Sequence, residues 1–119
     1  KQDKIKADEQ YGPIACWDVS KVTDMHCMFD GCAKFNSDIS YWDVSQVINM
    51  SRMFDGCWSF NRDISQWDVR KVTYMFYMFE SCWSFNCDLS NWEVSQVTTM
   101  VGMFWGCMYI EKLPEWYNQ

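Results

Sequence analysis

Residues 42–66 read WDVSQVINMSRMFDGCWSFNRDISQ, and this 25-residue pattern recurs along most of the chain. The stretch before it, residues 17–41, begins WDVSKVTDM. The two stretches after it, 67–91 and 92–115, begin WDVRKVTYM and WEVSQVTTM. We number the four stretches repeats one to four in chain order. A period of roughly 20–50 residues is typical of proteins built from stacked structural units.

Seven positions hold the same residue in all four repeats, and every one of them is apolar or cysteine. In repeat two they are Trp42, Val44, Val47, Met50, Met53, Phe54 and Cys57. Each unit of a stacked repeat protein buries a face of its neighbour, so each unit must present the same apolar shape. Identity restricted to apolar positions therefore predicts one continuous core shared by the repeats.

The spacing of these residues suggests the local structure. Apolar residues at steps of three and one between positions 47 and 57 indicate one face of a helix, with Gly56 near its C-terminal cap. The alternation of Trp42 and Val44 suits a short strand. We therefore expect an α/β fold, a right-handed leucine-rich-repeat-like solenoid of about four 25-residue strand–helix repeats.

The consensus WDVSxVTxMxxMFxGCxxFNxDIS resembles the repeat of the BspA-like leucine-rich repeat family. It is similar to the form known as a domain of unknown function in mycoplasma surface lipoproteins and in algal proteins. The resemblance covers residues 11–116. It implies a non-enzymatic binding module that is extracellular or attached to the cell surface. The alternative location is an organelle, where the chain would be a subunit of a membrane complex.

The expected boundaries follow the repeats. Residues 1–16 would form an N-terminal cap and half-repeat, 17–116 the four-repeat solenoid, and 117–119 a C-terminal tail. The polar stretch 1–10 would be a short capping helix or a frayed end, whereas Leu113, Pro114 and Trp116 would close the last repeat. Because the chain starts at Lys1 rather than Met, we expect a processed product or a fragment of a longer array.

Composition excludes several classes of function. Ten Lys and Arg against sixteen Asp and Glu give a net charge of −6, which is unsuited to binding nucleic acid. The sequence contains no run of about 18 consecutive apolar residues, so no transmembrane helix is expected. The only histidine, His26, has no counterpart in the other repeats, so neither general-base catalysis nor catalytic zinc is expected. We expect no enzyme activity, no cofactor and no metal site.

The seven cysteines fall into two groups. Cys32, Cys57, Cys82 and Cys107 form one of the invariant ladders and are expected to be buried free thiols that act as small apolar residues. Cys16, Cys27 and Cys87 occupy variable positions and are expected to be more exposed. These three are the better candidates for disulfide bonds, and the sequence leaves their state open.

The variable positions of the expected helices change character along the chain. Repeats one and two carry polar residues there, such as Asp24 and Arg52, whereas repeats three and four carry large apolar ones. An exposed aromatic surface that the core does not need marks a contact site, and Trp and Tyr dominate such contacts. We define the aromatic patch as six residues on this convex side: Tyr74, Phe76, Tyr77, Trp83, Val101 and Trp105.

A carboxylate lies between the first Trp and Val of each repeat and forms the acidic row of Asp18, Asp43, Asp68 and Glu93. Stacked like charges repel each other, so the row could bind a cation or a carbohydrate. Alternatively, each carboxylate could accept hydrogen bonds from nearby Ser or Thr hydroxyls and backbone N–H groups. Because the carboxylate is nearly identical in every repeat, the sequence favours the second, structural interpretation and leaves the first as an alternative.

Three functions follow from these observations. The favoured one is a non-enzymatic protein–protein interaction or scaffold module that docks through the aromatic patch. The first alternative is an accessory structural subunit of a larger assembly, such as an algal membrane complex. The second is cation or carbohydrate binding on the acidic row. A protein partner is expected, but the sequence does not identify it, nor the organism or the compartment.

Overall fold

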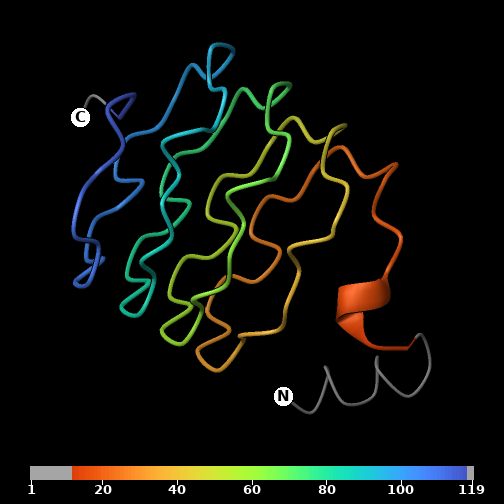
Figure 1. The fold of residues 1–119 in the computed structure, drawn as a ribbon, viewed down its shortest axis with the longest axis horizontal. Coiled ribbons are helices and arrows are strands. Elements are labelled where there is room, and N and C mark those ends of the chain that lie inside the picture. Colours follow the sequence, from red (N-terminus) through yellow and green to blue (C-terminus); the bar gives the residue numbers. More distant parts are fainter. Residues whose placement is uncertain (1–11, 118–119) are drawn as a thin grey trace.

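The computed structural model describes residues 12–117 of the chain. Figure 1 shows the backbone running in successive loops that lie side by side in sequence order, from the orange N-terminal part to the blue C-terminal part. Hydrogen bonds connect residues that are 24 to 28 positions apart, so each loop corresponds to one repeat. The expected capping structure at residues 1–10 lies outside the described residues.

The predicted fold class, an α/β right-handed leucine-rich-repeat-like solenoid, is wrong. Only 3% of the structure is helical and 4% is strand, and the one helix within residues 12–117 is η1, a 3-10 helix at Ile14–Cys16. Neither the expected helix at 47–57 nor the expected strand at 42–44 forms. Among residues 12–117 the parallel pairing consists of isolated bridges that link Asp24, Asn49, Tyr74 and Thr99 in succession.

A series of four-residue turns stands where the helix was expected. In repeat two, N–H groups bond to carbonyls three residues back, whereas an α-helix would use the carbonyl four residues back. These bonds run from Met53 to Met50, from Asp55 to Arg52 and from Cys57 to Phe54, at 2.9–3.3 Å. Arg52 and Gly56 have φ values of 57° and 75°, a left-handed conformation that a right-handed helix cannot continue through.

The N–H groups that are not used within these turns donate to carbonyls of the next repeat. Between repeats one and two, Met25, Cys27, Phe29 and Gly31 donate to the carbonyls of Asn49, Ser51, Met53 and Asp55, at 2.7–3.0 Å. Each donor lies 24 residues before its acceptor, and the pattern recurs at the next two junctions. Every junction is therefore held by such a row, in which the earlier repeat donates, and by a few bonds of the opposite direction, such as the one from the Ile48 N–H to the Thr23 carbonyl at 2.7 Å.

The apolar spacing fits both structures, which explains the wrong prediction. Apolar residues three positions apart share a face of a helix, but they also suit successive four-residue turns. Spacing alone does not encode that alternate N–H groups find their acceptors in the neighbouring repeat. Because buried N–H groups need a partner of some kind, this pairing replaces the hydrogen bonds that a helix would supply.

The core between the loops consists of stacked aromatic rings. Phe29, Phe54, Phe79 and Phe104 stack with centroids 5.5–5.7 Å apart. A second stack joins Phe35, Phe60 and Phe85 at 5.7–5.9 Å.

A row of tryptophans also connects the repeats. The indole N–H of Trp67 donates to the carbonyl of Ile39 at 3.1 Å, and Trp42 and Trp92 make the equivalent bond. The expected burial of Trp42 and Trp67 is confirmed, and Trp92 is buried as well, because each is only 4% exposed. Trp17, the corresponding residue of repeat one, is half-buried.

We predict that Trp67→Ala destabilises the protein by about 3–5 kcal/mol, because it removes a buried ring. Chemical denaturation followed by circular dichroism measures the change. Tyr41→Ala is the control, since Tyr41 is 91% exposed and its loss should cost little. Equal effects of the two substitutions would contradict the core assignment.

A second prediction concerns Ser81, which has a φ of 59° where the other repeats carry Gly31, Gly56 and Gly106. A left-handed conformation costs a non-glycine residue about 1–2 kcal/mol, and the extra chain entropy of glycine costs about 0.5–1 kcal/mol. Ser81→Gly should therefore stabilise the protein by up to about 1 kcal/mol, measured by thermal unfolding. The reverse substitution, Gly56→Ser, should destabilise it.

Candidate interaction surface

Tyr77 is the centre of the aromatic patch. Its ring meets Trp105 edge-on at 5.5 Å and Phe76 at 5.9 Å. It also lies so close to Gly102 that a methyl group there would overlap the ring. Tyr77 is half-buried, so it supports the surface as well as contributing to it. Its ring therefore packs against repeat four, and whether the fold needs this side chain stays a prediction.

The exposed part of the patch surrounds Tyr77. Trp105 is 48% exposed, and Tyr74 and Val101 are each 43% exposed. Val101 lies beside Tyr77 because its carbonyl accepts the Tyr77 N–H at 2.9 Å. Phe76 is half-buried, with its ring 6.3 Å from that of His26. The predicted neighbourhood of Phe76, Tyr77 and Trp105 is thus present in the structure.

Trp83 belongs to a separate surface. It stacks face to face on Trp58, with centroids 4.5 Å apart and parallel planes, and both rings are more than 40% exposed. Within residues 12–117 no ring contact joins Trp83 to Tyr77 or Trp105. We call Trp58 and Trp83 the Trp pair, and from here on the aromatic patch consists of the other five residues: Tyr74, Phe76, Tyr77, Val101 and Trp105.

Repeat two contributes a cation that sequence reasoning missed. The guanidinium of Arg52 lies 4.5 Å from the centroid of the Tyr77 ring, a distance typical of cation–π contacts. Arg52 also forms an ion pair with Asp55 at 2.9 Å. Burial and then the nearby Asp30 raise the pKa of Asp55. Arg52 and Tyr77 occupy equivalent positions in adjacent repeats, and that equivalence was the signal available in the sequence.

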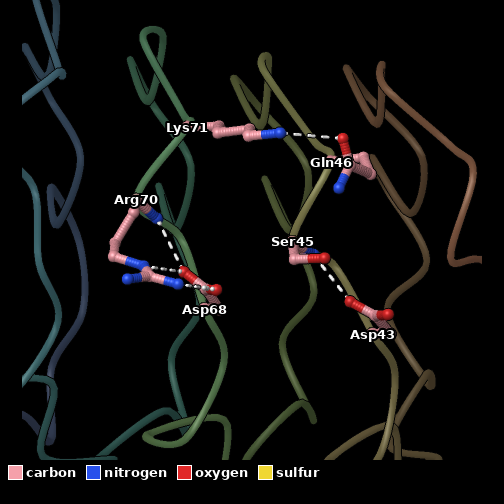
Figure 2. A network of polar contacts seen from close by, with 6 residues as sticks. All are labelled: Asp43, Ser45, Gln46, Asp68, Arg70 and Lys71. Atoms are coloured by element: carbon pink, nitrogen blue, oxygen red, sulfur yellow. Dashed lines mark hydrogen bonds and ion pairs between the residues drawn. The ribbon is translucent and has the colours of Figure 1, made fainter.

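Three carboxylates of the acidic row, those of Asp18, Asp43 and Asp68, are used within their own repeats, and the fourth residue, Glu93, is exposed. Figure 2 shows Asp43 beside Ser45, whose backbone N–H donates to it at 3.0 Å, and Asp68 held by the Arg70 side chain at 2.8 and 2.9 Å. Asp18 accepts from the N–H and hydroxyl of Ser20. Side-chain hydrogen bonds to Ser20, Ser45 and Arg70 lower the pKa of Asp18, Asp43 and Asp68.

This geometry favours the local interpretation of the acidic row over cation binding. In the part of the chain that the structure describes, no three His, Cys, Asp or Glu side chains are grouped closely enough to hold a metal ion. Lys71 reaches across to Gln46 at 2.9 Å. The surface around the row therefore carries both signs of charge rather than a purely acidic field.

The cysteine ladder is only partly buried. Cys57 and Cys82 are buried, Cys107 is half-buried, and Cys32 is exposed, so the prediction for Cys32 was wrong. The thiol of Cys57 donates to the carbonyl of Phe29 at 3.0 Å, and Cys82 and Cys107 make equivalent bonds. Burial raises the pKa of Cys57 and Cys107 to about 12 and raises that of Cys82 as well.

The three cysteines at variable positions differ in exposure. Cys16 is exposed, whereas Cys27 and Cys87 are half-buried. All seven thiols of the chain are free.

Comparison with known proteins shows the family. Residues 3–116 match the family described as Mycoplasma protein of unknown function, DUF285, and the chain belongs to it. The match supports the mycoplasma domain seen in the sequence but not the BspA-like leucine-rich repeat assignment. No curated protein and no solved structure matches the chain. Within residues 12–117 no helix has the length and apolar character needed to cross a membrane.

We predict that the thiols differ sharply in reactivity at neutral pH. Alkylation requires the thiolate, so Cys57 and Cys82 should resist iodoacetamide in the native protein, because burial raises both pKa values. Cys16 and Cys32 should be labelled quickly, since both are exposed. Peptide mass spectrometry after brief labelling measures the order. A denatured sample is the control, and equally fast labelling of Cys57 in the native protein would contradict this burial.

Proposed function

We propose that this protein is a non-enzymatic protein–protein interaction module that docks through the aromatic patch of repeats three and four. The observation that carries the proposal is Trp105, which is about half exposed and is held in place by the Tyr77 ring. Aromatic side chains held rigidly at a surface lose little conformational entropy on binding, and they supply most of the energy of many interfaces.

The position of the patch on the repeats supports this function. Tyr74, Val101 and Trp105 lie at positions that are polar in repeat one, where Asp24, His26 and Asp30 stand. Repeat one still makes its row of backbone bonds to repeat two, so folding does not require apolar residues at these positions. An exposed apolar surface that folding does not require is better explained by a partner.

Charge around the patch indicates what kind of partner would fit. The chain carries a net charge of −6, and Arg52 is engaged by Asp55 and Tyr77. A partner with an apolar centre and a basic rim would be complementary, and complementarity of this kind chiefly accelerates association. An extracellular or cell-surface location, which the sequence resemblance implies, is part of this proposal.

The two alternative functions make different demands on the structure. A permanent place in a larger assembly would use the same aromatic patch, and the size of the complex in native extract would distinguish it from transient docking. Cation or carbohydrate binding would use the acidic row, whose Asp18, Asp43 and Asp68 already accept hydrogen bonds from residues two positions on. No observation favours this last alternative over partner docking.

We predict that Val101→Ser combined with Trp105→Ser abolishes partner binding and changes the melting temperature little, because both side chains are nearly half exposed and neither belongs to the buried core. Immobilised wild-type and variant chains are incubated with extract of the source cells, and captured proteins are quantified by mass spectrometry. The affinity of each purified candidate is then measured by calorimetry. Loss of at least tenfold in affinity is expected when Trp105 is a dominant contact.

Two matched variants control this experiment. Tyr41→Ser removes an aromatic ring that is 91% exposed and lies outside the patch, so it should bind like the wild type. Asp43→Asn with Asp68→Asn changes the acidic row alone and should also bind normally. Binding that survives the loss of Val101 and Trp105 but disappears with the two aspartates would refute docking through the patch.

A further inference from the structure

The Trp pair belongs to a row of equivalent positions that repeat one leaves without a ring. The position after the ladder cysteine holds Trp58 in repeat two and Trp83 in repeat three. Their rings lie in parallel planes with centroids 4.5 Å apart, a separation typical of stacked aromatic side chains. Repeat one carries Ala33 at this position, and its side chain ends at a single methyl group. The row therefore has a position beside Trp58 that no ring of the row fills.

The backbone at Ala33 follows the same pattern as the backbone at the two tryptophans. The Ser59 N–H donates to the carbonyl of Ala33 at 3.1 Å, and the Ser84 N–H donates to the carbonyl of Trp58 at 3.2 Å. Ala33 is therefore placed next to Trp58 as Trp58 is placed next to Trp83. Because Trp83 covers one face of the Trp58 indole, the opposite face points towards repeat one and lies above Ala33.

This second face of Trp58 is open. Trp58 is 46% exposed even though one face of its ring is stacked. Among residues 12–117, Trp83 supplies the ring contact of Trp58, and the cation found over an aromatic ring is Arg52 on Tyr77. The fold therefore presents a flat apolar surface, held in place by its partner ring, with neither a ring nor a cation upon it.

A cation stands beside this open face. Ala33 and Lys34 are the two central residues of a turn that is closed by the Phe35 N–H and the carbonyl of Cys32 at 3.0 Å, so both side chains project out of the loop. Lys34 is exposed, and within residues 12–117 it takes part in no ion pair. Repeats two and three carry serine at this position. Repeat one therefore combines a missing ring with an unpaired ammonium group.

We propose that the open face of Trp58 binds a small aromatic acid, whose ring stacks above Ala33 while its carboxylate pairs with the Lys34 ammonium group. The ligand ring would continue the row at the separation that the Trp pair shows. Because Ala33 and Lys34 are adjacent, the ring and the carboxylate must lie only a few bonds apart, which fits one small molecule. The Trp pair is stacked without a ligand, so binding orders little of the protein. This site does not depend on the aromatic patch having a partner.

Three probes that share the indole ring and differ in charge test the proposal. Indoleacetate is anionic, indole is neutral and tryptamine is cationic. Each is titrated into the isotope-labelled full chain, and the indole N–H signal of Trp58, assigned through Trp58→Phe, is followed by NMR. Indoleacetate should shift this signal saturably and bind about two- to fivefold more tightly than indole, the gain typical of one exposed ion pair. Tryptamine should bind more weakly than indole, and added salt should narrow both differences.

Two variants give repeat one the residues that repeats two and three already carry, so the fold should accept them. Ala33→Trp supplies the missing ring and should abolish the Trp58 shift with all three probes. Lys34→Ser should leave the binding of indole unchanged and remove the advantage of indoleacetate. Tyr41→Ser removes an exposed ring outside the row and is the matched control, so it should bind like the wild type. Thermal unfolding reports whether each variant is folded.

Several outcomes would overturn the proposal. They are the absence of a Trp58 shift at the solubility limit of indoleacetate, unchanged binding by a folded Ala33→Trp chain, and equal affinity for the three probes. If Ala33→Trp does not fold, the probe order and Lys34→Ser decide alone. An acidic tryptophan-containing peptide that shifts Trp58 where indoleacetate does not would assign the face to a protein partner and refute the proposal. The Val101→Ser, Trp105→Ser chain should bind indoleacetate normally, which separates this site from the aromatic patch.

Discussion

The row of backbone hydrogen bonds between neighbouring repeats is the interaction on which the rest of the structure depends. The turns within a loop satisfy only alternate N–H groups, so the others must find carbonyls in the next loop. A single repeat would leave those groups without partners, at a cost comparable to several lost hydrogen bonds. The loop conformation therefore requires stacking. This register also fixes the phenylalanine stacks: the Phe29 N–H bonds to the carbonyl of Met53, which places Phe54 over Phe29, and Phe79 follows Phe54 in the same way.

The sequence predicts which residues are buried better than it predicts the conformation of the backbone. The invariant Trp42 and Trp67 are buried as expected, because repetition of a large apolar residue requires a shared interior. The helix was a wrong prediction, because a spacing of three residues suits turns as well as helices. Cys32 shows a further limit: it belongs to an invariant ladder yet is exposed, since no preceding repeat covers its end of the stack within the described residues.

For the candidate surface, too, the sequence predicts which residues are neighbours but not how their side chains are arranged. Adjacent repeats place Phe76, Tyr77 and Trp105 close together, and this much follows from their positions in the period. The period does not determine side-chain direction, so it could not show that Tyr77 packs on Gly102 beneath Arg52. It also could not show that Trp83 turns towards Trp58. Equivalent positions identify neighbours, whereas rotamers decide which neighbours make contact.

Because the backbone holds the repeats together, side chains on the outside can vary without disturbing the stack. The position shared by His26, Ser51 and Phe76 illustrates how far this freedom extends. Ser51 is completely buried and its hydroxyl has no hydrogen-bond partner among the described residues, while the rings of His26 and Phe76 approach to 6.3 Å. An unsatisfied hydroxyl costs about 1–3 kcal/mol, yet the Ser51 carbonyl still accepts the Cys27 N–H at 3.0 Å. A fold that tolerates such a cost at a variable position can also carry aromatic residues at other variable positions, and this is why these positions, rather than the invariant ladders, are where a binding surface can arise.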